Sequence, residues 1–268
     1  MSVNYIVRFS SEAALGWVPY KVPWTSQPLE GTVIDSSNPL ARDLAAYFPF
    51  HYPTQRDQTG RVASIPNGGP VRSPHDGYQA TYLARTTNEK ITINKTALFD
   101  VVGKEAWTVS IWANFDGSAG SSHDLVTQWR YTGGVKTFTL TGPHNTDVAF
   151  FGIFEDGGGS PYIQGTTNLA TATGWHHIVA TLVDGVRMRL YVDGVKEAED
   201  LSINIINTTA SESLWAVGGQ VDYDTNLYKG WLRDFGFWTR ELQEAEVKSL
   251  YEDPWQIFEP RTMYVPVT

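Results

Sequence analysis

The sequence contains no cysteine, which excludes disulfide bonds and thiolate metal sites. Small secreted modules usually rely on disulfides, so we expect synthesis and folding in a reducing cytosol. Basic residues are also scarce, since 20 Lys and Arg stand against 29 Asp and Glu and give a formal net charge of −9. No compact basic stripe reverses this sign locally, and an acidic surface repels phosphate backbones. Nucleic-acid binding is therefore not expected.

Long apolar runs are missing as well. Nowhere do about 18 apolar residues follow one another, as a membrane-spanning helix requires. The first residues, MSVNYIVRFSSEAALGWV, include Arg8 and lack the basic-then-apolar order of a signal peptide. We therefore expect neither membrane insertion nor export by the usual route.

Aromatic residues, in contrast, are abundant: 10 Trp, 13 Tyr and 12 Phe in 268 residues. Such side chains favour sandwich cores, glycan-stacking surfaces and protein interfaces, so three interpretations stay open. The 41% apolar and 18% charged content is that of an ordinary globular protein with enough apolar surface for a sizeable core. One large domain with terminal extensions is expected.

Residues 44–253 have the pattern of a β-sandwich. Short β-branched and aromatic runs are separated by Gly, Asn and Asp, as strands are by turns. In VRMRLYVD the alternation places Met188 and Leu190 on one face and Arg187 and Arg189 on the other. One face of this strand is thus core and one is solvated. The sequence therefore predicts an all-β, antiparallel sandwich.

Two turn signals and one helix refine this prediction. Asp-Gly pairs at 184–185 and 193–194 separate neighbouring strands, and Asp-Gly accepts the positive φ angles of a two-residue hairpin. The segment LQEAEVKSLYED, residues 242–253, has apolar residues at helical spacing, and Pro254 ends it. We expect one short helix near the C-terminus.

The two ends of the chain differ from its middle in composition. Residues 1–43 are rich in Pro, Ser and aromatics and predict an extended arm, and residues 254–268 predict an extended tail. Exposed aromatic rings are costly in water, so both ends should lie on a surface, their own or a neighbour's. The residues expected to contact partners are Trp17, Tyr20 and Trp24 in the arm and Trp255 and Phe258 in the tail.

Several segments resemble, in the right order, the laminin-G-like branch of the concanavalin A-like lectin superfamily. They are AWTVSIWANF at 106–115, GWHHIVAT at 174–181, RLYVDGV at 189–195, LWAVGGQ at 214–220 and YKGWLRDFGFWTREL at 228–242. The resemblance implies a jelly-roll sandwich with a short C-terminal helix. The flanks PWTSQPLEGTVIDSSNPLARDL and DPWQIF resemble those of laminin-G-like proteins of tailed phages and prophages, which implies a virion component.

No catalytic or metal-ligating constellation stands out. His176 and His177 are adjacent on a predicted strand, so their side chains point to opposite faces and cannot share one metal ion. EAED, residues 197–200, comes nearest to the paired carboxylates of glycoside hydrolysis, with a solvated acidic face as the ordinary explanation. Residues 222–226, DYDTN, offer oxygen ligands for calcium, with a polar loop as the alternative. We expect no cofactor apart from this possible calcium ion.

Aromatic residues near loops are the candidate glycan-stacking groups. The segment EDGGGSPY, residues 155–162, is typical of a loop at the sandwich edge and lacks the Lys-Ser/Thr ending of a phosphate loop. Loops of this kind carry binding functions, and an exposed ring beside them could stack on a sugar. The candidates are Trp129, Tyr131, Tyr162 and Tyr223, with packing in the core as the alternative.

The preferred hypothesis is a non-enzymatic bacteriophage virion structural protein that decorates or cements the head and is held by its terminal arms. Its expected partners are the major capsid protein or other virion proteins, further copies of the chain in a trimer, and host-surface glycans. Its expected location is the virion, after synthesis in the bacterial cytoplasm. The alternative is a carbohydrate-binding adhesin on a tail fibre or the head surface. A lesser alternative is a glycoside hydrolase or lyase of the same fold.

Overall fold

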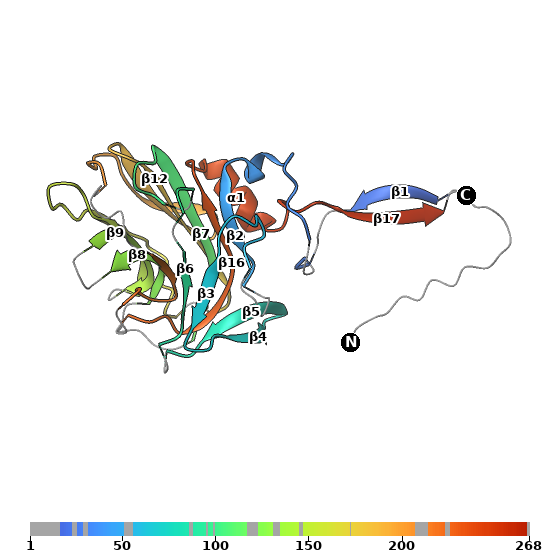
Figure 1. The fold of residues 1–268 in the computed structure, drawn as a ribbon, viewed down its shortest axis with the longest axis horizontal. Coiled ribbons are helices and arrows are strands. Elements are labelled where there is room, and N and C mark those ends of the chain that lie inside the picture. Colours follow the sequence, from blue (N-terminus) through green and yellow to red (C-terminus); the bar gives the residue numbers. More distant parts are fainter. Residues whose placement is uncertain are drawn as a thin grey trace.

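The computed structural model describes residues 17–22, 26–28, 32–50, 56–85, 88–94, 96–98, 100–116, 123–130, 135–144, 147–171, 173–206, 214–222 and 226–266. Within these ranges two antiparallel sheets face one another across one apolar core, and a short α-helix lies outside the second sheet (Figure 1). The predicted fold class is therefore confirmed. No helix in the same ranges is long and apolar enough to cross a membrane.

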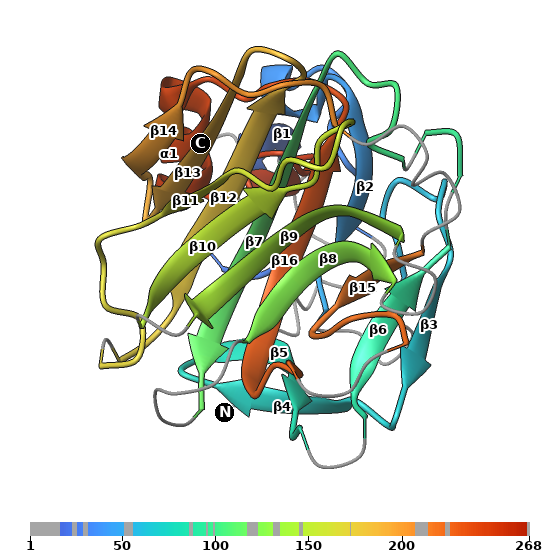
Figure 2. The same cartoon turned by 90° about the vertical axis from the view of Figure 1, so that its left-hand side faces the viewer.

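The seven-stranded sheet forms one layer and lies in front in Figure 2. Because side chains alternate along a strand, Phe138 and Leu140 enter the core while Thr139 and Thr141 face outward. The strand order is β11 (Tyr162–Gln164), β10 (Val148–Ile153), β9 (Val135–His144), β8 (Asp124–Arg130), β15 (Trp215–Val217), β6 (Lys90–Ile93) and β3 (Ser64–Asn67).

The eight-stranded sheet forms the other layer. Two of the segments that resemble laminin-G-like domains lie side by side at its centre, as the strands β7 and β12. The strand order is β14 (Val195–Asp200), β13 (Arg187–Val192), β12 (His176–Val183), β7 (Ala106–Phe115), β16 (Gly230–Trp238), β5 (Tyr78–Leu83) and β4 (Val71–His75), with β2 (Leu44–Phe48) also paired to β16.

Large aromatic rings fill the space between the sheets. Trp107 and Trp215 come from opposite sheets, and both contact Phe138 with 4.9 Å between ring centroids. All three side chains are fully buried. Burying rings of this size stabilises the fold by about 1.5–3 kcal/mol each. Several of the many aromatic residues therefore form the core between the sheets.

The two Asp-Gly turns differ from one another. At Asp193-Gly194 the strands β13 and β14 join through a two-residue loop, in which both residues have positive φ angles, 51° and 78°. At Asp184-Gly185 the loop also includes Val186, so it has three residues before the pairing of β12 with β13 begins. The prediction of a two-residue hairpin is confirmed at the second turn and wrong at the first.

Three strands of the sandwich lie outside the β-branched and aromatic runs that predict strands. β3 and β4 contain Pro66 and Pro74, and each strand forms the edge of a sheet. A proline is tolerated at an edge, because its missing N–H group breaks no ladder there. β11 has three residues and forms the other edge of the seven-stranded sheet. Short or proline-containing strands carry little periodicity, which explains why the sequence pattern misses them.

The terminal segments do not form two separate arms. β1 (Trp17–Val22) pairs antiparallel with β17 (Arg261–Pro266), and together they form a two-stranded ribbon that projects from the sandwich (Figure 1). Residues 32–43, expected in the arm, lie instead against the sandwich, where Ile34 forms a β-bridge with Phe258. The domain boundary expected at residue 43 therefore falls earlier in the chain.

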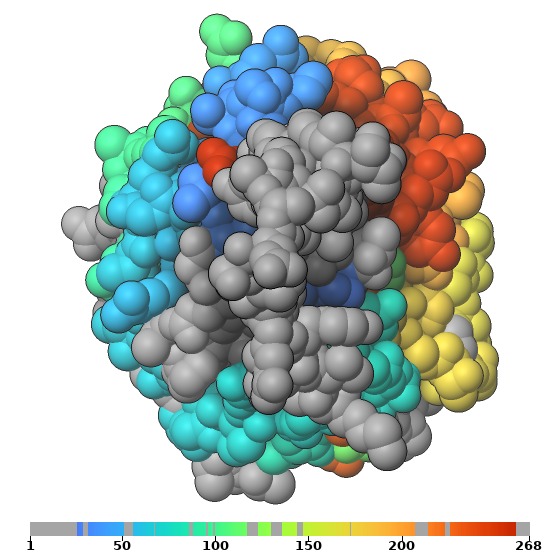
Figure 3. All heavy atoms as spheres, turned by 90° about the vertical axis from the view of Figure 1, so that its right-hand side faces the viewer, coloured from blue at the N-terminus to red at the C-terminus, as the bar shows by residue number. Residues whose placement is uncertain are grey.

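The partner-contact prediction is corrected for Trp255 and Phe258. Both side chains are buried, 7% and 4% exposed, in an apolar cluster between α1 (Glu244–Glu252) and the outer side of the eight-stranded sheet. The chain turns back onto the sandwich after the helix, so its own domain covers these rings. Trp17 and Tyr20 lie on β1, and Trp24 lies outside the described residues. Figure 3 shows the side of the molecule that is on the right in Figure 1. There the segment of residues 32–43, in blue, lies beside α1, in orange-red.

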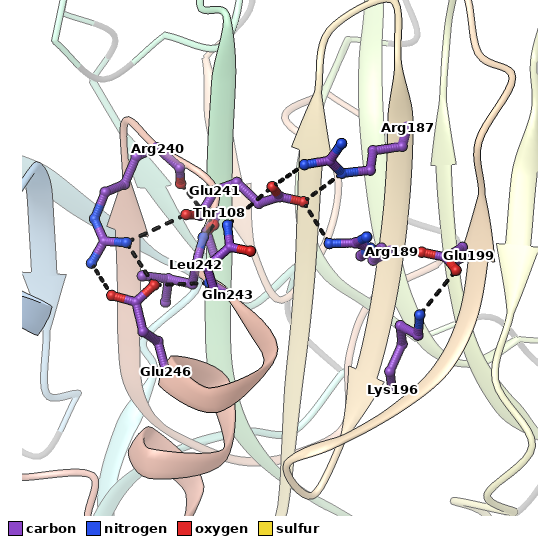
Figure 4. A network of polar contacts seen from close by, with 10 residues as sticks. All are labelled: Thr108, Arg187, Arg189, Lys196, Glu199, Arg240, Glu241, Leu242, Gln243 and Glu246. Atoms are coloured by element: carbon purple, nitrogen blue, oxygen red, sulfur yellow. Dashed lines mark hydrogen bonds and ion pairs between the residues drawn. The ribbon is translucent and has the colours of Figure 1, made fainter.

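A polar network fixes the start of α1 to the sandwich (Figure 4). The carboxylate of Glu241, just before the helix, accepts hydrogen bonds from Arg187 at 2.6 Å and Arg189 at 3.1 Å, both on β13. Arg240 donates two hydrogen bonds to Glu246, which also takes part in a capping box at the helix start. The helix is thereby held against the sheet.

Candidate functional site

A groove of about 170 Å³ lies on the outward face of the seven-stranded sheet, near its β11 edge. Strands β8 to β11 and the glycine-rich loop before β11 supply most of its wall. Four aromatic side chains and several small polar ones line it. The aromatic residues are Trp129, Phe150, Phe154 and Tyr162.

Gly152 makes one flat aromatic wall possible. A Cβ atom at this position would lie 2.8 Å from Cε1 of Phe150, so the absence of a side chain lets that ring lie over the strand. Phe150 then stacks on Tyr162, with 5.0 Å between ring centroids and 25° between planes. Tyr162 is 58% exposed, so part of its ring is open to a ligand.

Trp129 stands in the other wall. A bulge between Gln128 and Trp129 shifts the register of β8 against β9, and bulges of this kind redirect side chains. The Trp129 ring meets Phe154 edge to face at 5.2 Å, and the ammonium group of Lys136 lies 4.7 Å from its centroid. These contacts fix the orientation of the indole.

A buried carboxyl group lies at the floor of the groove. Asp124 is 1% exposed, and burial raises the pKa of its carboxyl group to about 7, although Gln220 donates a hydrogen bond to it at 2.8 Å. Burial lowers the pKa of the adjacent His123 to about 4, so this imidazole is neutral at neutral pH. The Thr141 hydroxyl has no partner in the described part of the chain, and Asn226 lines the groove nearby.

An open aromatic ring beside such polar groups suits a sugar. The C–H face of a pyranose packs on an aromatic face, while its hydroxyl groups bond to carboxyl, amide and hydroxyl side chains. Hydrolysis has a further requirement, because two carboxyl groups must flank the glycosidic bond. Among the described residues that line the groove, Asp124 alone carries a carboxyl group. This lining can therefore bind a sugar but does not supply the second catalytic carboxyl.

The EAED segment stands elsewhere, on the edge strand β14 and its end. Glu197 accepts a hydrogen bond from the backbone N–H of Thr166 at 2.7 Å. Glu199 forms ion pairs with Arg189 at 2.7 Å and Lys196 at 2.9 Å. These carboxylates hold a loop and neighbouring strands in place, and the structure does not bring them to the groove.

His176 and His177, which the sequence predicts on opposite faces of one strand, each have a partner of their own. Nδ1 of His176 lies 2.8 Å from a carboxylate oxygen of Asp193, and Nε2 of His177 lies 2.7 Å from the Ser110 hydroxyl. Throughout the described ranges, no group of three or more His, Cys, Asp or Glu side chains could hold a metal ion. Residues 223–225 of the calcium candidate lie outside the described residues.

Two of the four predicted glycan-stacking residues meet in the groove. Both Trp129 and Tyr162 line it, but only the Tyr162 ring is exposed, whereas Trp129 is partly buried. Tyr131 and Tyr223 lie outside the described residues.

Sequence reasoning missed Phe150 and Asp124. Phe150 lies in the run DVAFFGIF, whose apolar residues all suggest a place in the core. It lies on the outward face because side chains alternate along a strand and the neighbouring Phe151 is buried. Asp124 opens a strand without any pattern around it. No signal in the sequence predicts that its carboxyl group is buried beside a groove.

Solved structures with similar folds include the binding domains of bacterial toxins and a domain of an arabinanase. The binding domain of Paraclostridial mosquitocidal protein 1 has a TM-score of 0.64 at 15% identity, over 79% of this chain and 52% of that one. The binding domain of botulinum neurotoxin DC, in complex with SialylT, has 0.63 at 12%, over 79% and 51%. Domain 4 of AbnA, an extracellular arabinanase from Geobacillus stearothermophilus in complex with arabinotriose, has 0.59 at 16%, over 78% and 98%. The chain thus spans about half the length of the two toxin domains, and these likenesses show the fold.

The family is shown by the sequence match. None of the curated proteins is similar to this chain. The family model described as the concanavalin A-like lectin/glucanases superfamily, of the laminin G type, matches residues 85–248, more than half of the chain. This range holds the central strands of both sheets and every described residue that lines the groove. The chain therefore belongs to the concanavalin A-like lectin/glucanase superfamily.

Proposed function

We propose that this protein is a non-enzymatic carbohydrate-binding domain whose ligand lies in the groove between Tyr162 and Trp129. The observation that carries the proposal is the exposed ring of Tyr162, held in place by its stack on Phe150. A ring fixed in this way loses little conformational entropy when a ligand stacks on it. Asp124 and Asn226 supply hydrogen-bonding groups for sugar hydroxyls beside the aromatic walls.

Related domains support this proposal. The arabinanase domain was solved with arabinotriose and the neurotoxin domain with SialylT, and the family includes lectins. The family also includes glucanases, but hydrolysis requires two carboxyl groups and the described lining of the groove contains one. We therefore propose binding without catalysis.

Calorimetry with the best ligand from a broad glycan array tests the groove. Tyr162→Ala removes the exposed ring, and we expect the affinity to fall about tenfold or more. Tyr162→Phe retains the ring and should retain most of the affinity. Leu201→Ala changes a similarly exposed apolar residue outside the groove and serves as the matched control.

Three results would contradict the proposal. The first is the absence of binding to any glycan on the array. The second is equal affinity of the wild type and Tyr162→Ala for the array ligand. The third is steady release of reducing sugar from a polysaccharide panel by the purified chain, which would show hydrolysis.

A second function, proposed from the terminal ribbon, is a structural role in a bacteriophage virion. The first and last described residues lie at one end of the ribbon, since Trp17 pairs with Pro266, and the sandwich lies at the other (Figure 1). Such a shape suits attachment at the ribbon and display of the sandwich. The flanks that resemble phage proteins also support it. In this proposal the ribbon end of the domain faces the head, next to the major capsid protein, and the groove faces host-surface glycans.

Electron microscopy of the phage with gold-labelled antibody against the sandwich tests this role. We expect regular labelling over the head, and loss of the label when residues 1–31, which include β1, are deleted from the phage gene. Labelling confined to the tail would place the protein as an adhesin on a tail fibre. Unlabelled particles would contradict a virion role of either kind.

A further inference from the structure

The outer face of the eight-stranded sheet carries an unusual concentration of aromatic rings. Outward positions of a sandwich are ordinarily polar, yet Trp112 on β7 and Tyr78 on β5 stand there beside Arg233 on β16. The guanidinium of Arg233 lies 4.1 Å from the Trp112 ring centroid, 4.4 Å from that of Tyr78 and 4.9 Å from that of Trp175. Arg233 is buried and pairs with Asp234, so the rings pack around a fixed charge.

These rings border a cavity of about 610 Å³ between the sheet and α1. Its mouth carries two acidic side chains, Asp76 and Glu252, which are 55% and 62% exposed. The indole N–H groups of Trp175 and Trp255, two lining residues, are buried and have no acceptor within the described ranges. We name it the tryptophan cavity, and its main aromatic residues are Tyr78, Trp112, Trp175, Tyr251 and Trp255.

A cavity with this lining fits a particular kind of segment. Aromatic grooves bind extended, proline-containing chains, whose rings pack on the aromatic faces and whose main-chain carbonyl groups accept hydrogen bonds from indole donors. The acidic mouth favours a segment with basic side chains. An extended chain that contains proline, aromatic and basic residues, and no acidic residue, has all of these properties.

The β1–β17 ribbon of the same chain has this composition. Its strands, WVPYKV and RTMYVP, contain prolines and aromatic residues, two basic residues and no acidic one. Among the described strands the ribbon pairs with no other sheet, and it points away from its own sandwich (Figure 1). A two-stranded ribbon alone in water is marginally stable, so a further surface is needed to cover it.

We propose that the ribbon of one copy docks in the tryptophan cavity of a second copy, and that the protein self-associates through this contact. Ribbon prolines and aromatic rings pack on the cavity walls, while Lys21 and Arg261 meet Asp76 and Glu252 at its mouth. The inference rests on the second proposed function, because it names the first partner of the ribbon. Glycan binding does not depend on it.

The position of the cavity allows this exchange to close. The cavity lies at the root of the ribbon, since Trp255 in its wall precedes β17 by a few residues. A few residues after β1, the side chain of Gln27 forms two hydrogen bonds with the backbone of Gln79, next to Tyr78 of the cavity. Two copies can therefore exchange ribbons reciprocally, or several copies can form a ring, and in both cases every ribbon and every cavity is used.

Sedimentation velocity of the purified full chain over a range of concentrations tests the contact. Lys21→Glu with Arg261→Glu reverses the charge of the ribbon. Asp76→Asn with Glu252→Lys changes the mouth of the cavity, and asparagine suits the positive φ of position 76. We expect each pair to weaken self-association about tenfold or more, and all four changes together to restore part of it. Glu105→Lys, outside the cavity lining, is the charge-matched control.

A monomer at every concentration would overturn the inference. An oligomer that both variant pairs leave unchanged would also overturn it, because another surface would then make the contact. Calorimetry of the same samples separates the proposals: a monomer that still binds glycan contradicts the ribbon contact alone. Gold labelling of phage that carry a monomeric variant separates it from the virion role, since a labelled head with a monomeric protein would leave that role standing.

Discussion

At the scale of single residues, Asp124 and Gly152 determine what the groove can offer. Asp124 holds a carboxyl group under the aromatic walls, and burial keeps its pKa near neutrality instead of near the usual value for aspartate. Gly152 leaves the space that lets Phe150 lie flat beneath Tyr162. Neither residue belongs to a recognisable sequence motif, so their roles follow only from their positions in the fold.

Asp124→Asn is expected to flatten the pH dependence of stability. The pKa of this carboxyl group is near 4 in the unfolded chain and about 7 in the folded one, so the folded state holds an extra proton between these values. The wild-type free energy of unfolding therefore falls as pH rises from about 4 to about 7 and levels off above. The variant lacks this pH-dependent contribution, because its side chain does not titrate. Urea unfolding at a series of pH values measures both proteins. Parallel stability curves would rule out the raised pKa.

Gly152→Ala is expected to weaken glycan binding with little loss of stability. The new methyl group would push the Phe150 ring away, because its Cβ atom would lie 2.8 Å from that ring. The stack beneath Tyr162 would then be disturbed. The free energy of unfolding should fall by only about 1 kcal/mol, because the ring can swing outward. Calorimetry and urea unfolding measure the two effects. Unchanged affinity would show that the stack does not shape the ligand site.

At the scale of strands and helices, the sequence pattern predicts what is regular. The long β-branched and aromatic runs that become β7, β12, β13 and β16 are predicted, because such residues favour the packed surface of a sheet. The pairing of β1 with β17 is not predicted, since two segments from opposite ends of the chain leave no local signal of their contact. The burial of Trp255 escapes prediction for the same reason, because a turn after the helix decides it.

Glu241 is expected to hold α1 in place on the sandwich. Burial by itself would raise the pKa of Glu241, but the hydrogen bonds and charges of Arg187, with help from Gln243 and Arg189, outweigh it and hold this pKa below its usual value. Glu241→Gln should therefore lower the free energy of unfolding by about 2 kcal/mol at neutral pH. The difference should shrink as pH falls through the folded-state pKa of Glu241, because the wild-type group then becomes neutral as well.

Urea unfolding of Glu241→Gln at neutral and acidic pH checks this expectation. Glu105→Gln, an exposed glutamate on the same chain, is the matched control and should change stability little at either pH. A variant as stable as the wild type at neutral pH would show that the arginine contacts of Glu241 make no net contribution to the free energy of unfolding.

At the scale of the whole molecule, the two sheets have different tasks in this account. The groove lies on the outward face of the seven-stranded sheet, whereas the tryptophan cavity and α1 lie on the outer face of the eight-stranded sheet. The ribbon projects on the side opposite the sheet that carries the groove (Figures 1 and 2). Self-association at one sheet therefore leaves the groove of every copy open, and several weak sugar contacts can act together.

Ionic strength is expected to weaken the assembly. The ribbon contributes Lys21 and Arg261, and the mouth of the cavity contributes Asp76 and Glu252 at exposed positions, where salt screens their attraction. Sedimentation velocity at low and high sodium chloride concentration measures the change in self-association. Association that is stronger at high salt would mean that the contact is apolar throughout and does not involve these charges.

Mapping the ligand on the protein tests whether a glycan occupies the groove of the seven-stranded sheet. Amide chemical shifts of the isotope-labelled chain, recorded while the array ligand is titrated in, locate the contact residue by residue. We expect the largest shifts on β8, β9, β10, β11 and the loop of residues 155–161, with β4, β5 and α1 unchanged. Shifts that gather instead around the tryptophan cavity would contradict it.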